Sequence, residues 1–435
     1  MPTRAQIAPI LTGILLLGWF FHPVDTPPPF ELEENDLRLD ASRLKIGQRT
    51  FERWLGWVDP YGQLQDAVVM NAEALEISLK GEARFTAQWV QGEPPSKEPE
   101  NAGSLTGLRI LLDPGHYGGA WSEHESRHVQ RDGELPIREG NLTYATAELA
   151  AEALTRAGAT VYLTREAPPT TPFESHIPPP ALLEREAAIW LGNNGHRSDT
   201  RLLMKGYPMW IADRLLRYKR DAKVRDSAAH LFTLGDLRQR SALATACDAH
   251  ALISIHYNGA KRPEVNHVMA FVPGHFMEGE LISPASRRLA LDALMSGRLP
   301  VSARLGKNLV DALQDEMGLT TIDEAKRGRS YPLPGYRGVF ARNLAVLRRT
   351  RVPVVLAEGP FMSHPAEYDK ILDLETGRPG IRSEEYARAI LRAVKESAWD
   401  LKRFREQQGA ESGREACPID PWPAEVPTKE PSYTR

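Results

Sequence analysis

Four residues of this chain could bind a metal ion or move protons, and each lies at the end of an apolar run or at the start of a helix. His116 ends LLDPGH, Glu139 lies in REGNL, His256 ends ISIH and Glu358 ends VVLAE. Two imidazoles and one carboxylate form the ligand set of a catalytic zinc ion that keeps one position open for water. The remaining glutamate is the type of group that transfers protons beside such an ion. These residue types predict one metal site with a neighbouring acid–base group.

Three of these residues follow short runs that are almost entirely apolar. The runs are LRILL at 108–112, ALISI at 251–255 and VPVVLA at 352–357. Such runs are typical of parallel strands that are buried on both faces. In an open parallel sheet the ligand crevice lies beyond the carboxyl ends of the strands. We therefore expect His116, His256 and Glu358 to converge at one edge of a sheet.

Glu139 reaches the same place from a helix. Residues from about 141 to 157 carry apolar side chains at helical spacing, and Gly158 follows as a stop signal. A glutamate just before this stretch lies near the positive end of the helix dipole, which favours its ionised form. We expect Glu139 to point back toward His116.

Several segments together resemble a known family. In order along the chain they are DPGH at 113–116, EGNL at 139–142, SIHYN at 254–258, RGVFARNLAVLRR at 337–349 and PVVLAEGPFMS at 353–363. This pattern, which covers roughly residues 105–400, resembles the zinc-dependent N-acetylmuramoyl-L-alanine amidases of cell-wall hydrolysis, the amidase 3 family.

The resemblance implies roles for the four residues. Zn2+ would be held by His116, Glu139 and His256, and Glu358 would take a proton from the zinc-bound water and hand it to the leaving amine. The substrate would be peptidoglycan, cleaved at the amide between N-acetylmuramic acid and L-alanine. The resemblance also leaves open an activator protein as a partner.

Four residues near these motifs raise separate questions. Asp113 either orients a zinc-bound imidazole or serves as a turn residue before Pro114. Tyr117 stands where the family usually has a second glycine, and we expect it to narrow the entrance. Pro360 and His364 replace the usual glycine and asparagine, which puts substrate detail in doubt rather than the chemistry.

Two other functions compete with this interpretation. The segment HESRH matches the zincin protease signature, in which His124 and His128 on one helix face bind zinc and Glu125 acts as base. Its surroundings offer one clear apolar residue, Val129, so a polar surface segment is the better prediction. A non-catalytic peptidoglycan-binding or regulatory homologue would be expected to have lost a ligand or Glu358, and this chain retains all four residues.

The elements predict an α/β fold: a mostly parallel twisted sheet flanked by helices, with a small N-terminal extension and a long helical insertion. We expect the extension and a linker at 23–104, the catalytic domain at 105–404 and a mobile C-terminal tail at 405–435. The insertion, at about 166–235, carries apolar helical faces and a basic stripe. It is either a flap over the groove or a support for the domain.

The N-terminus suggests a place in the cell envelope. An apolar run at 7–21 follows Arg4 and is short for a membrane-spanning helix. We expect residues 1–22 to be a signal peptide or an anchor in the inner membrane, which makes the protein periplasmic or secreted.

Composition restricts the function only weakly. The chain has 435 residues and a formal net charge of −3, so the charge gives no reason to expect nucleic acid as a partner. Cys247 and Cys417 are its two cysteines, and the sequence leaves open whether they pair.

Overall fold

The computed structural model describes residues 37–91, 103–117, 122, 126–131, 136–165, 236–322, 330–373, 379–409 and 416–423. Within these ranges the largest element is a seven-stranded sheet with the order β10-β11-β9-β12-β8-β4-β7. Its strands are β4 (Arg109–Pro114), β7 (Thr160–Leu163), β8 (Ala251–Asn258), β9 (Met269–Pro273), β10 (Tyr331–Pro332), β11 (Val339–Arg342) and β12 (Val354–Phe361).

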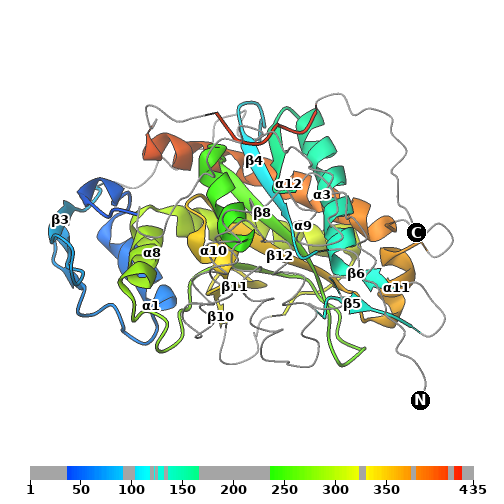
Figure 1. Cartoon of the computed structure of the whole chain (residues 1–435), viewed down its shortest axis with the longest axis horizontal. Helices are drawn as coiled ribbons and strands as arrows, with labels where there is room; N and C mark the ends of the chain where they lie inside the picture. Colours follow the sequence, from blue (N-terminus) through cyan, green and yellow to red (C-terminus); the bar gives the residue numbers. More distant parts are fainter. Residues whose placement is uncertain are drawn as a thin grey trace, which may run out of the picture.

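Four neighbouring strands of this sheet run parallel. They are β7, β4, β8 and β12, and all their carboxyl ends therefore lie at one edge. Strand β9 pairs antiparallel with β12, and β11 pairs parallel with β9. The edge strand β10 pairs antiparallel with β11. The predicted α/β fold, with a mostly parallel sheet flanked by helices, is confirmed (Figure 1).

Alternate residues of the central strands pack into two separate apolar clusters. Ile110 and Ile253 join the cluster that holds the long helices α3 (Glu139–Arg156), α9 (Arg298–Met317) and α12 (Ile381–Gln408). Leu111 and Leu252 join a second cluster with the helical segment 236–246 and the short helix α10 (Ala345–Arg349). Because successive side chains of a strand point to opposite faces, helices cover both faces of the sheet.

The described part of the N-terminal extension is a small unit on one end of this domain. It comprises the 3-10 helix η2 (Ala41–Arg43), helix α1 (Gln48–Val58) and an antiparallel sheet of β1 (Val68–Met70), β2 (Ala74–Ile77) and β3 (Phe85–Gln88). Helix α1 contacts α8 (Pro284–Met295), and buried Phe51 and Trp54 join the same apolar cluster as the long helices (Figure 1). The extension is therefore packed against the domain that contains the seven-stranded sheet.

The C-terminal boundary differs from our expectation. Helix α12 continues to Gln408, and Cys417 forms a disulfide with Cys247. The backbone N–H of Trp422 donates to the Val161 carbonyl on strand β7, at 2.7 Å. Within the segment for which we expected a mobile tail, residues 405–408 thus belong to helix α12, and residues 416–423 include a cross-link to the domain.

Three further elements of the described chain are short. These are β5 (His128–Val129), which pairs with β6 (Ile137–Arg138), and helix α11 (Pro365–Ile371). The predicted signal or anchor at 1–22 and the insertion at 166–235 lie outside the described residues. In the part of the chain that is described, no helix combines the length and the apolar character needed to cross a membrane.

Candidate metal centre

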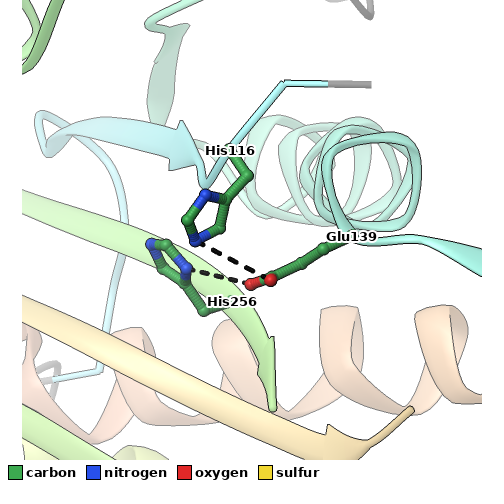
Figure 2. Close-up of side chains that lie close together, drawn as sticks. All are labelled: His116, Glu139 and His256. Carbon is green, nitrogen blue, oxygen red and sulfur yellow. Dashed lines mark hydrogen bonds and ion pairs between the residues drawn. The ribbon is translucent and has the colours of Figure 1, made fainter. Parts of the chain in front are cut away.

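His116, Glu139 and His256 lie together at the carboxyl edge of the parallel strands. One possible ligand atom from each lies within 4.8 Å of those from the other two. His116 Nε2 is 3.7 Å from Glu139 Oε2, and His256 Nδ1 is 3.1 Å from Glu139 Oε1 (Figure 2). The two imidazole rings are almost perpendicular, with centroids 4.9 Å apart. The structure thus brings together the three residues for which the sequence predicts a ligand role, and we call them the metal centre.

His116 occupies a loop with an unusual backbone. It follows strand β4 and has φ of +54°, in the left-handed region that costs a non-glycine residue about 1–2 kcal/mol. The preceding Gly115 passes close to His256, since an added Cβ would lie 2.3 Å from that ring. A glycine is therefore required here for the two histidines to approach each other.

Glu139 is the first residue of helix α3, which begins two residues before the predicted start at about 141. Its backbone N–H donates to the Arg127 carbonyl at 3.0 Å, and its Oε1 accepts from the Tyr257 N–H at 3.2 Å. The side chain is 1% exposed, and Oε2 accepts no hydrogen bond from the described residues. Burial alone would raise the pKa of Glu139, but nearby His116 and the hydrogen bond with His256 outweigh it, so the pKa is lowered.

The centre therefore fits a divalent cation. An ionised, buried carboxylate, one oxygen of which accepts no hydrogen bond from the described residues, faces two imidazoles, and this set of nitrogen and oxygen donors suits zinc among the divalent transition metals.

Glu358 lies beside this centre on the next strand. In the parallel pairing of β12 with β8 it is the register partner of His256. Burial raises the pKa of Glu358 to about 7, Glu139 adds to the rise, and His256 opposes it. Among the described residues, Glu358 is not one of the three side chains whose possible ligand atoms cluster.

The zincin alternative is wrong for this fold. His124 and Glu125 lie outside the described residues, but Ser126 has φ of +56° and His128 pairs with Arg138 in the β5–β6 ladder. A zincin site needs both histidines on one continuous helix, and a strand at His128 excludes that arrangement.

Asp113 has neither of its predicted roles. It lies within strand β4, so it is not a turn residue. Its carboxylate accepts hydrogen bonds from Thr164 at 2.8 Å, Ser254 at 2.6 Å and Arg240 at 3.1 Å, none of which is an imidazole. Burial would raise the pKa of Asp113, but Arg240 and Ser254 outweigh it and lower the pKa.

Tyr117 does not narrow an entrance, because its side chain is buried, at 2% exposed. Its ring contacts the guanidinium groups of Arg165, at 4.6 Å, and Arg240, at 5.6 Å. These contacts of the two arginines were not predicted from the sequence, because isolated arginines 75 residues apart in the chain form no motif. His364, another departure from the family pattern, caps helix α11 by accepting from the Ala366 N–H at 3.2 Å.

Comparison with known proteins places these motifs in one family. The family model for N-acetylmuramoyl-L-alanine amidase, amidase 3, matches residues 110–396. YrvJ of Bacillus subtilis (strain 168), a candidate N-acetylmuramoyl-L-alanine amidase by name, is 39% identical over 102 residues. That match covers 21% of this chain and 18% of the relative.

Solved structures of amidases are also similar. Ami1, an N-acetylmuramyl-L-alanine amidase of Mycobacterium smegmatis, matches with a TM-score of 0.39 and 16% identity, over 68% of this chain and 99% of that one. The CwlD amidase of Clostridioides difficile, solved in complex with the GerS lipoprotein, matches with a TM-score of 0.37 and 18% identity. It covers 67% of this chain and 98% of that one.

Proposed function

Because this chain belongs to the amidase 3 family of N-acetylmuramoyl-L-alanine amidases, we propose that it hydrolyses the amide between N-acetylmuramic acid and L-alanine in peptidoglycan. His116, Glu139 and His256 would hold a zinc ion for this reaction. The observation that carries the proposal is the buried Oε2 of Glu139, which lacks a hydrogen-bond donor among the described residues and faces two imidazoles. When bound there, zinc would lower the pKa of water to near 7 and polarise the substrate carbonyl.

The protein's own residues provide the proton transfers. Burial raises the pKa of Glu358 to about 7, which suits a group that accepts and releases a proton near neutral pH. Its strand places it beside His256, where it would take the proton of the attacking water. It would then donate that proton to the leaving nitrogen of L-alanine.

The proposal includes a place in the cell envelope, periplasmic or secreted. The disulfide between Cys247 and Cys417 supports it, since disulfides persist mainly in oxidising compartments. The apolar run at 7–21 supports it independently. An inner-membrane anchor and an activator protein stay predictions.

Two measurements on the purified protein test the function. Metal analysis should find one zinc per chain, lost in the His116→Ala variant and retained in His128→Ala. Digestion of peptidoglycan, followed by mass spectrometry, should release stem peptides with a free L-alanine amino group. Zinc binding with no such product would instead support a non-catalytic homologue.

A further inference from the structure

The loop that carries His116 is held by side chains at three consecutive carbonyl groups. The Pro114 carbonyl accepts from Arg240 Nη1 at 3.1 Å, the Gly115 carbonyl from Thr143 Oγ1 at 2.6 Å, and the His116 carbonyl from Arg165 Nη1. In addition, the Gly115 N–H donates to the Ile255 carbonyl at 2.9 Å. We call Thr143, Arg165 and Arg240 the loop clamp.

The clamp holds the His116 backbone in a conformation that would otherwise relax. A histidine with positive φ persists only where its surroundings over-determine it. The three clamp residues come from different parts of the fold: Thr143 from helix α3, Arg165 from the segment after β7, and Arg240 from the helical segment 236–246. A shift of the loop would therefore break hydrogen bonds to three separate elements.

The charges around the clamp are balanced, which matters beside a cation site. Arg165 and Arg240 are each 2% exposed. Arg240 forms ion pairs with Asp113 and Asp236, so two buried arginines face two buried aspartates and the cluster has no net charge. The ring of Tyr117 contacts both guanidinium groups. Two arginines can thus lie close to the metal centre without repelling a bound dication.

Arginine is suited to this task for a geometric reason. The fixed fork of a guanidinium can bind several acceptors at once. Arg240 binds the Asp113 carboxylate and the Pro114 carbonyl through one nitrogen and pairs with Asp236 through another. A lysine, with a single flexible ammonium group, would not hold the same set.

We propose that Thr143, Arg165 and Arg240 are positioning residues that hold His116 in its metal-binding conformation. The inference rests on the proposed function, because it concerns the same metal centre. It assigns the clamp a role in metal affinity and coordination geometry rather than in folding alone. Loss of a group that orients a metal ligand typically weakens metal binding about 10–100-fold.

The test compares Arg165→Gln with Arg298→Gln, a matched change of a buried arginine in helix α9. Three quantities are measured: the Zn2+ dissociation constant by competition with a chelator, the absorption spectrum of the Co2+-substituted protein, and metal-free thermal unfolding. Arg165→Gln should weaken zinc binding about 10–100-fold and alter the Co2+ spectrum. Arg165→Lys should recover part of the affinity. Arg298→Gln should lower the unfolding temperature and leave both metal readouts unchanged.

If Arg165→Gln fails to fold, a less disruptive substitution can still test the proposal. Thr143→Val removes the hydrogen bond to the Gly115 carbonyl with almost no change in volume, and it should weaken zinc binding in the same direction. Wild-type affinity and an unchanged Co2+ spectrum in a folded Arg165→Gln or Thr143→Val protein would overturn the clamp. Absence of zinc binding in the wild-type protein would instead overturn the proposed function.

Discussion

Two clusters of buried charged residues in this molecule differ in how their carboxylate oxygens are paired. In the Asp292 cluster, formed by Arg43, Asp292 and Arg298, both carboxylate oxygens accept from arginines. In the metal centre, one buried oxygen of Glu139 has no hydrogen-bond donor in the part of the chain that the structure describes. Burial would raise the pKa of Asp292, but Arg298 and Arg43 outweigh it and lower the pKa to about 2. The pKa of Glu358, by contrast, is raised to about 7.

This difference distinguishes buried charged groups that stabilise the fold from buried charged groups that could bind a ligand. A buried charge is costly unless it is paired, and both oxygens of the Asp292 carboxylate accept from arginines, which joins the N-terminal extension to helices α8 and α9. The metal centre places one carboxylate beside two imidazoles, and among the described residues the pairing of Glu139 is incomplete. A cation would complete it, so changes in the two regions should affect different measurements.

The largest effect should follow from removal of a ligand. We expect His256→Ala to lose the bound zinc and to reduce amidase activity below detection, because two ligands would remain. Metal analysis beside a peptidoglycan digest measures this. A full equivalent of zinc in the His256→Ala protein would contradict the ligand role of His256 and the contrast between the two regions.

Glu358→Gln should affect chemistry alone. We expect zinc binding and the fold to be kept while turnover falls about 10²–10⁴-fold, the usual contribution of a positioned acid–base group. The rate should be measured on a zinc-loaded sample with a soluble muropeptide. A wild-type rate in that sample would remove Glu358 from the proposed mechanism.

Asp292→Ala should lower the stability of the fold and leave zinc binding unchanged. It leaves Arg298, which is fully buried, without its partner, and we expect the free energy of unfolding to fall by about 3–5 kcal/mol. Zinc affinity, measured below the unfolding transition, should stay at the wild-type value. A loss of affinity would show that the two regions are coupled.

The disulfide provides a smaller, separate test of stability. Cys417→Ser opens a cross-link between residues separated by 170 positions, and we expect a loss of about 2–4 kcal/mol in denaturant unfolding. Reduction of the wild-type protein should reproduce this loss, whereas reduction of the variant should change nothing more. Equal stability of the oxidised wild type and the variant would contradict the expectation.

The pH dependence of unfolding gives the smallest effect. The folded-state pKa of Asp292 lies below its ordinary value of 3.8, at about 2. Its contribution is therefore fully present above about pH 4 and is lost as the pH falls through 2. Between pH 5 and pH 2, the stability advantage of the wild type over Asp292→Asn should shrink by roughly 1–2 kcal/mol. An advantage that is constant with pH would disprove the paired state.

Residue types and patterns were enough to predict the main fold and the members of the candidate site. Apolar runs that end at His116, His256 and Glu358 indicated parallel strands, and the structure places these ends at one edge of the sheet. Glu139 joined them because a helix start follows its own sequence rules. The orienting role for Asp113 was a wrong prediction, because nothing local indicates which buried partners a carboxylate will find.

The sequence by itself indicated the strands that end at His116, His256 and Glu358, the helix next to Glu139 and the convergence of these four side chains. Only the tertiary structure decided how the His116 loop is held. The clamp residues bind backbone carbonyls 28 to 126 positions away, and a carbonyl is the same in every residue, so these contacts leave no pattern of residue types. The pairing of Cys247 with Cys417 depended in the same way on the fold, which brings two distant cysteines together.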